Sequence, residues 1–168
     1  DVTGVQTCAL PIWEAIRELT QAARRGARCK VYEQLLADLY ARIGNAAKSL
    51  EYIEGLLEAR PDAAQRESLL LQAAERQLEL RRPEEALQRV EDTAKETAQT
   101  ARALKIKVSA CLMLGHTAQA MQTLQDIPGE TPDERIAVLK QFLDVHELLH
   151  ENAALRRELD GMQQAHKM

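Results

Sequence analysis

The chain is poor in aromatic residues, glycine and proline, and these shortages exclude several classes of fold. Aromatic residues make up 3% of the 168 residues, with seven glycines and five prolines. Sandwiches and barrels need strands rich in aromatic and β-branched residues, so this composition favours an all-α fold. No apolar run approaches the roughly 20 residues that cross a bilayer, so we expect no membrane-spanning segment.

The chain also lacks an excess of positive charge and a pattern of paired cysteines. Its formal net charge is -4, which argues against a nucleic-acid or membrane-surface partner. Cys8, Cys29 and Cys111 show neither disulfide nor metal-ligand spacing. A reducing compartment is the default for such a protein, so we expect a cytoplasmic location. With 45% hydrophobic and 29% charged residues, the chain can bury a core.

The first twelve residues stand apart from the rest of the chain. They read DVTGVQTCALPI, without an evident helical or alternating period, and a helical pattern begins after them at Trp13. The segment resembles the translation of a short-read sequencing adapter, a contaminant of proteins from metagenomic assemblies. We therefore expect residues 1–12 to be an unstructured artefact that replaces the natural N-terminus. A genuine N-terminal arm or strand is the alternative, and resequencing of the locus would decide.

From Trp13 onward the sequence has the period of amphipathic helices. Apolar and small residues recur at spacings of three and four, for example at Ile16, Leu19 and Ala23. Glycine and proline fall between these runs, where helices stop and start. We predict helices at residues 13–25, 30–43, 46–59, 63–81, 84–97, 101–114, 117–126 and 132–165, and no strand.

The predicted helices repeat in pairs. Ala86 and Ala120 lie early in the second helices of successive pairs and are 34 residues apart. Gly44 and Gly115 end first helices. A period of 34 residues with two helices per unit favours an α-solenoid of the tetratricopeptide repeat (TPR) type.

The first complete unit resembles the TPR family in its residues. It contains LYARIGNAAKSLEYIEGLLEARPD, with Tyr40 late in the first helix and Gly44 at the turn. Ser49 takes the place of the small residue where the two helices approach, and Pro61 ends the second helix. The resemblance implies an orphan second helix at residues 13–26, units at about residues 30–63, 67–100 and 101–134, and a capping helix with a heptad-patterned tail at residues 135–168.

Two departures from the family pattern leave an unrelated helical bundle as the alternative. The second unit keeps PEEAL at residues 83–87 but has Arg81 where the turn glycine would be. The large aromatic residue that the family carries early in the first helix is absent from all three units.

The resemblance implies a binding groove lined by the first helices, which is where arrays of this kind hold partner polypeptides. Acidic residues on the second unit and basic ones on the third indicate a peptide of mixed charge, although each residue also fits an ordinary solvated surface. The groove positions would be Gln34, Asp38, Arg42, Leu71, Glu75, Leu78, Glu79, Arg102, Lys105, Ser109 and Leu112. TPR chaperone adaptors grip a C-terminal carboxylate with Lys and Asn, whereas this chain has Gln34, Asp38 and Gln72 at such positions. We therefore expect it not to bind chaperone tails.

The last predicted helix begins with a strong start signal and continues into a heptad seam. Thr131 supplies the N-cap, Pro132 the first helical position and Glu134 the third. Residues at the a and d positions could pair two chains in parallel, with Asn152 fixing the register, or could fold back onto the solenoid. The seam would be Val145, Leu148, Asn152, Leu155, Leu159 and Met162.

The tail also contains an H-E-x-x-H match. His146 and His150 are one turn apart with Glu147 beside them, as in zinc peptidases. Catalytic zinc needs a third protein ligand, and the chain offers no convincing one. The three residues take heptad positions b, c and f, so we read the match as chance on a solvated helix and expect no metal and no cofactor.

These observations predict a non-catalytic scaffold that binds a partner polypeptide in the TPR-like groove. The alternative is the input and linker fragment of a larger bacterial signalling enzyme. Its basis is the tail LHENAALRRELDGMQQAHKM, which resembles the coiled linker before the phosphoacceptor helix of bacterial hybrid histidine kinases.

Overall fold

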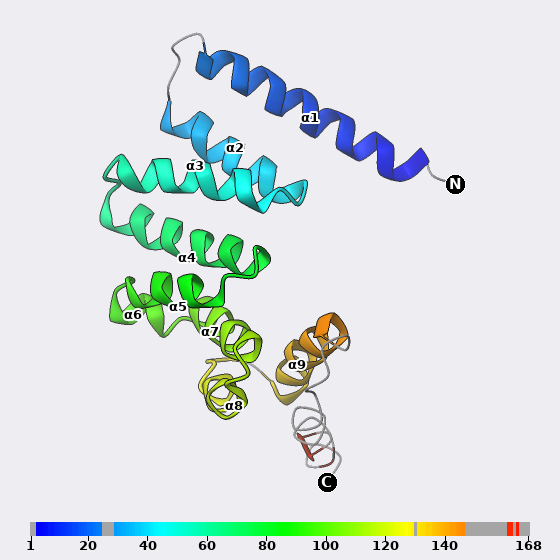
Figure 1. Cartoon of the computed structure of the whole chain (residues 1–168), viewed down its shortest axis with the longest axis vertical. Coiled ribbons are helices and arrows are strands. Elements are labelled where there is room, and N and C mark those ends of the chain that lie inside the picture. The colour runs from blue at the N-terminus through cyan, green and yellow to red at the C-terminus, as the bar shows by residue number, and fades with distance from the viewer. Residues whose placement is uncertain (1–2, 25–28, 130, 147–160, 163, 165–168) are drawn as a thin grey trace. The chain divides into compact units, whose positions relative to one another are not determined.

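Every element that the computed structural model describes is an α-helix. The described residues are 3–24, 29–129, 131–146, 161, 162 and 164. They contain no strand, so the all-α prediction is confirmed for them. The helices are α1 (Thr3–Arg24), α2 (Lys30–Arg42), α3 (Ala46–Glu58), α4 (Ala63–Glu79), α5 (Pro83–Glu91), α6 (Lys95–Ala98), α7 (Ala101–Met113), α8 (Thr117–Gln125) and α9 (Pro132–His146) (Figure 1).

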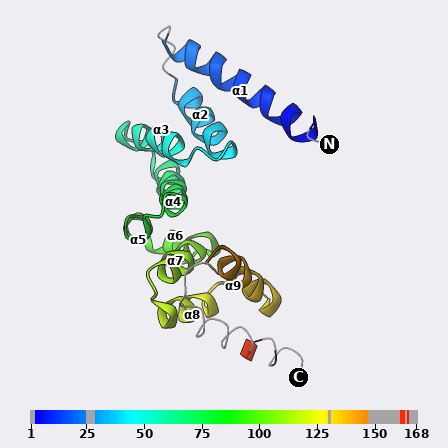
Figure 2. The ribbon, with the colours of Figure 1, turned by 45° about the vertical axis from the view of Figure 1, so that its right-hand side comes forward.

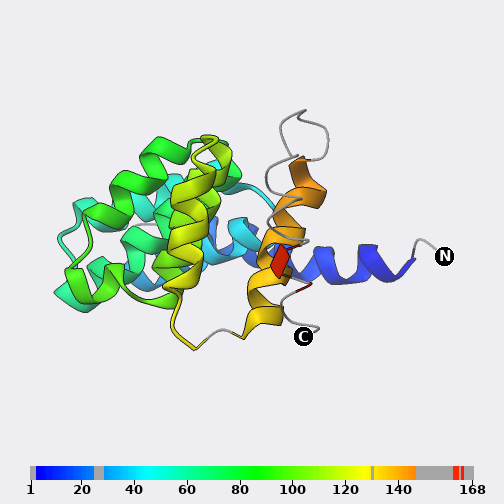
Figure 3. The same ribbon diagram turned by 90° about the horizontal axis from the view of Figure 1, so that it is seen from below.

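The helices fall into two units, Asp1–Thr93 and Ala94–Met168. In the first unit, α2 packs along α3, α3 along α4 and α4 along α5, and the chain reverses direction at each step (Figure 2). The second unit contains a further pair, in which α8 (yellow) lies along α7 (Figure 3). Short antiparallel pairs packed in sequence are the building blocks of a helical solenoid.

Helix α1 corrects the prediction for residues 1–12. The helix begins at Thr3, so the expectation of an unstructured segment before Trp13 is wrong. That expectation overlooked a helical period, because apolar side chains recur there at spacings of three and four. They are Val5, Cys8, Ala9 and Ile12. Pro11 lies inside α1 and removes one backbone hydrogen-bond donor from it.

The helix predicted at residues 84–97 is divided into α5 and α6. The hydroxyl of Thr93 donates to the carbonyl oxygen of Val90 at 2.6 Å, and the Thr93 side chain is buried. A threonine hydroxyl that bonds nearby backbone competes with the helical hydrogen-bond pattern. Ala94 is then extended, with φ -60° and ψ 154°, and α6 begins after it.

The turn between the two helices of each pair contains one residue in the left-handed conformation. Gly44, Arg81 and Gly115 have φ of 77°, 61° and 76°. Glycine takes this conformation at little cost, whereas a residue with a side chain is strained there. Arg81 thus occupies the position of the missing turn glycine and adopts the same backbone form.

Small buried side chains lie in the second helix of each pair. Ser49 on α3, Ala86 on α5 and Ala120 on α8 are all buried. The Ser49 hydroxyl donates to the carbonyl oxygen of Ala37 on α2 at 2.8 Å, so the serine touches the backbone of its partner helix. This contact agrees with the role predicted for Ser49.

Each unit has its own apolar cluster. In the first unit, the cluster joins α2, α3 and α4 and consists of Ala37, Leu50, Ile53, Leu56, Leu69 and Ala73. In the second, it joins α7, α8 and α9 and consists of Leu104, Val108, Cys111, Leu112, Ala120, Leu124, Ile127, Ile136 and Leu139. The burial of Cys111 raises the pKa of its thiol.

The start of α9 is a capping box, as predicted. The Glu134 amide donates to the Thr131 hydroxyl at 3.3 Å, and the Thr131 amide donates to the Glu134 carboxylate at 2.7 Å. The Thr131 hydroxyl also donates to that carboxylate at 2.9 Å. These bonds from Thr131 lower the pKa of Glu134.

Replacing Arg81 with glycine is expected to stabilise the protein. The change removes left-handed backbone strain worth about 1 kcal/mol. Part of this gain is offset, because glycine loses more conformational entropy on folding than arginine does. Urea unfolding followed by circular dichroism would measure the gain. Gly115→Ala is the matched opposite change and should destabilise by a similar amount. No gain for Arg81→Gly would show that the turn does not strain this residue.

The capping box predicts a pH dependence of stability. Because folding lowers the pKa of Glu134, its contribution is complete above the ordinary carboxyl pKa of about 4.3 and is lost as the pH falls through the lowered value. Glu134→Gln should therefore be less stable than wild type at pH 6, and the gap should close towards pH 3. Thr131→Ala removes the hydroxyl donor but keeps the backbone amide that also donates to Glu134, so it should flatten the profile only in part. If the free energy of unfolding of wild type and Glu134→Gln changed in parallel with pH, the stabilising role given to the Glu134 carboxylate would be wrong.

Candidate functional site

In the first unit, the first helices of the two pairs lie on one side and the second helices on the other. Gln34 on α2 donates from its side-chain Nε2 to Oε1 of Gln72 on α4 at 3.1 Å. Arg89 on α5 pairs with Glu54 on α3. One polar link therefore joins α2 to α4, and a separate one joins α3 to α5. This is the two-layer arrangement that gives a repeat array a binding surface lined by first helices.

We call the exposed side of these two first helices the α2–α4 face. On each helix its residues are three or four positions apart, so they share one side. The α2–α4 face consists of Val31, Gln34, Leu35, Asp38, Arg42, Ser68, Gln72, Glu75 and Glu79, all of them exposed or half-buried.

Polar side chains form a continuous ladder across this face. Nε2 of Gln34 donates to Oδ1 of Asp38 at 3.0 Å as well as to Gln72. Nε2 of Gln72 donates in turn to Oγ of Ser68 at 3.2 Å. The ladder thus runs from Asp38 on α2 to Ser68 on α4 and fixes the orientation of both amides.

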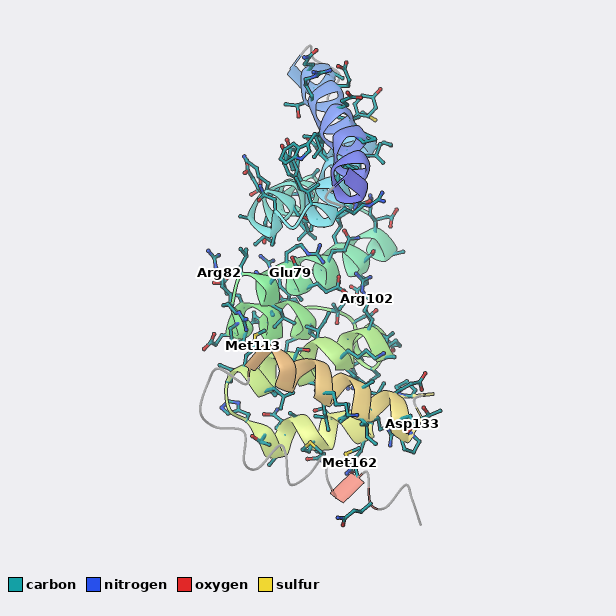
Figure 4. The ribbon with its side chains drawn as sticks, turned by 90° about the vertical axis from the view of Figure 1, so that its right-hand side faces the viewer. Glu79, Arg82, Arg102, Met113, Asp133 and Met162 are labelled. Carbon is teal, nitrogen blue, oxygen red and sulfur yellow. The ribbon has the colours of Figure 1, made fainter. Side chains whose placement is uncertain are left out.

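The two ends of the α2–α4 face differ in character. Val31 and Leu35 are 61% and 43% exposed, and they are two of the large apolar side chains that α2 leaves in water. At the other end, Arg76 lies 3.0 Å from the Glu79 carboxylate and 3.8 Å from the Glu75 carboxylate. Glu79 is at the end of α4, close to the α4–α5 turn that holds Arg82 (Figure 4).

The structure places the predicted groove residues unevenly. Gln34, Asp38, Arg42, Glu75 and Glu79 are on the α2–α4 face. Leu71, at 5% exposure, is buried, and Gln72 next to it occupies the surface instead. Leu78 is half-buried.

The second unit carries the other predicted groove residues on α7. Arg102 and Lys105 are exposed, and Ser109 is half-buried. Leu112 is 7% exposed and belongs to the apolar cluster, so it offers a partner almost no surface. For the exposed residues of both units, a role in partner binding stays a prediction.

A pocket that the sequence did not indicate lies beside Trp13. It has a volume of about 400 Å³. Its walls come from α1, the α2–α3 turn, the start of α3 and the end of α4, and they are Trp13, Ile43, Gly44, Asn45, Ala46, Ala47, Glu79 and Leu80. Trp13 is 53% exposed, whereas Ile16, one turn later on α1, is buried. Only a tertiary arrangement brings these four segments together, so no local sequence signal could have shown the pocket.

Most of the predicted dimer seam and of the zinc match lies outside the described residues. The residues outside are Leu148, Asn152, Leu155 and Leu159 of the seam, and Glu147 and His150 of the zinc match. Val145 and His146 lie in the last turn of α9, where the backbone alone is described. Met162 is half-buried and packs against the apolar cluster of the second unit (Figure 4). For this residue, folding back onto the chain is the arrangement observed.

The described residues also bear on metal binding and on membrane insertion. They contain no group of three His, Cys, Asp or Glu side chains placed to hold a metal ion. None of the helices in the described part of the chain is long and apolar enough to span a bilayer.

Comparison with known proteins identifies the fold. The structure is similar to that of MamA residues 41 to the end from Desulfovibrio magneticus RS-1, with a TM-score of 0.65 and 18% identity over 95% of this chain and 91% of that one. A double mutant of MamA RS-1 gives the same score and identity over 96% and 91%. MamA is a TPR-like helical solenoid, so the TPR-like fold predicted here is confirmed. No known family profile and no curated protein matches the chain.

The burial of Ile16 and the exposure of Trp13 predict that Ile16, and not Trp13, attaches α1 to the rest of the first unit. Ile16→Ala removes a buried side chain and should cost about 2–4 kcal/mol. Trp13→Ala should cost at most about half of that, because half of the indole is already in water. Thermal unfolding followed by far-ultraviolet circular dichroism would compare the two variants. A larger loss for Trp13→Ala would mean that the indole carries the packing of α1.

Proposed function

We propose that the protein is a non-catalytic scaffold that binds a partner polypeptide on its first helices, beginning with the α2–α4 face. The TPR-like fold supports this function, since such arrays present their first helices as an extended binding surface. The observation that carries the proposal is the Gln34–Gln72 bond. It joins residues 38 positions apart across two first helices, so the side chains of both helices form one surface.

The chemistry of the face suits binding. It combines exposed apolar groups at Val31 and Leu35 with amides and carboxylates that are held by hydrogen bonds or ion pairs. Ordered polar groups lose little conformational entropy when a ligand arrives, and apolar groups beside them add buried area. On α7, Arg102, Lys105 and Ser109 extend the proposal to the second unit.

The two alternatives from the sequence have less support. The resemblance to a histidine kinase linker rests on residues 149–168, most of which lie outside the described part of the chain. Parallel pairing of tails would need Met162 at the seam, whereas Met162 packs against the cluster of its own unit. A monomeric mass in dilute solution would agree with the contact that Met162 makes within its own unit.

Peptide binding to wild type and to two sets of variants would test the scaffold proposal. Heptapeptides retained from a random library would be labelled, and their affinities measured by fluorescence anisotropy. Gln34→Arg with Gln72→Arg places bulky charge in the centre of the α2–α4 face and should weaken binding by more than tenfold. Glu51→Arg with Glu58→Arg places the same arginines on exposed positions of α3, with twice the change in charge per site, so an unchanged affinity there is a stringent control. Equal losses of peptide affinity in both double variants, or no loss in the Gln34→Arg, Gln72→Arg variant, would contradict the proposed binding face.

A further inference from the structure

We propose that the α2–α4 face selects peptide segments in which a Lys or Arg side chain lies two residues from an apolar side chain. This inference rests on the proposed scaffold function and names the class of polypeptide that the face binds. Three observations lead to it: the direction of the hydrogen-bond ladder, the charges around it and the two apolar groups beside it.

The direction of the ladder follows from the carboxylate of Asp38. An ionised carboxylate only accepts hydrogen bonds, so Gln34 must turn its NH₂ group towards Asp38. The second hydrogen of the same NH₂ group points to Oε1 of Gln72. Nε2 of Gln72 then donates to Ser68. Both donor hydrogens of Gln34 are therefore used inside the ladder.

The groups that remain for a ligand are acceptors. Among the hydrogen bonds of the described residues, none uses Oε1 of Gln34 or Oδ2 of Asp38. Asp38 is exposed and Gln34 half-buried, so both oxygens belong to the surface. A pair of acceptors, one of them charged, favours a ligand that donates several hydrogen bonds. Ammonium and guanidinium groups do so, whereas a peptide carboxylate does not.

The charges of the face point in the same direction. Asp38 receives a hydrogen bond from an uncharged amide, and Glu75 and Glu79 share the guanidinium group of Arg76. The negative charge of Asp38 therefore favours a cationic side chain beside it and disfavours an acidic one.

The apolar part of the preference comes from Val31 and Leu35. Val31 lies three residues before Gln34, and Leu35 lies three residues before Asp38, on the same side of α2. The midpoint of these two residues is about 7.5 Å from Asp38 along the helix axis, at 1.5 Å per residue. In an extended peptide, residues i and i+2 point to the same side and are about 7 Å apart. One extended segment can therefore place an apolar side chain on Val31 and Leu35 and a cation at Asp38.

A random library of acetylated and amidated heptapeptides, screened on the full chain, would test this preference. Peptides retained by wild type should be enriched in Lys or Arg two residues from Leu, Ile, Val or Met. Replacing that Lys with norleucine, which keeps the length and removes the charge, should weaken binding about three- to tenfold, and replacing it with Glu should weaken it further. The weakening should shrink at high salt, since it comes from charge.

Asp38→Asn supplies the decisive variant. Asparagine can still accept the Gln34 hydrogen bond, so the ladder is kept while the charge is lost. The enrichment in Lys and Arg should disappear with Asp38→Asn and persist with Glu51→Gln, the same chemical change on α3. Leu35→Ser should remove the apolar part of the preference and leave the basic part.

The outcomes separate this inference from the scaffold proposal. Peptides that bind the face without a basic preference, or with an acidic one, would overturn the inference and leave the scaffold in place. A library from which wild type retains no peptide would contradict both. Circular dichroism of each variant would confirm that the helices are intact.

Discussion

The close approach of two helices at a small residue is the constraint on which the rest of this structure depends. Ser49, Ala86 and Ala120 are buried in the second helices of the three pairs, and Ser49 touches the backbone of α2 directly. A larger side chain at these positions would force the helices apart, because packed interiors have no spare volume. The crossing fixes each pair as a unit, so α2 and α4 face one side and α3 and α5 the other. Gln34 can reach Gln72 only because of that alternation.

The sequence revealed the helical pairs because their signals are local. Period, N-caps and turn residues act within a few positions, and the left-handed backbone of Arg81 shows that the turn persists where its glycine is missing. The break between α5 and α6 was not foreseen, since it depends on which way one threonine hydroxyl turns. The apolar period before Trp13 was overlooked, so α1 is longer than predicted.

The candidate site was predicted in part, and its errors have a geometric reason. Neighbouring residues on a helix point about 100° apart, so a shift of one position exchanges surface for core. Leu71 was placed in the groove, yet it is buried and Gln72 takes the surface. The predicted repeat at residues 67–100 has Arg81 in place of the turn glycine, so the family pattern does not fix the register of its first helix. The Trp13 pocket draws on four segments, and only their packing brings them together.

The distribution of chromophores between the two units has a spectroscopic consequence. Trp13, Tyr32, Tyr40 and Tyr52 all lie in the first unit, and the chain has no other tryptophan or tyrosine. Absorbance near 280 nm and intrinsic emission therefore come from that unit alone, whereas the far-ultraviolet signal comes from helices throughout. The stacked rings of Tyr40 and Tyr52, with centroids 5.8 Å apart, form a compact optical probe at the α2–α3 crossing. Tryptophan and tyrosine emission would thus not report on Ala94–Met168, and the buried thiol of Cys111 is a poor site for attaching a label there.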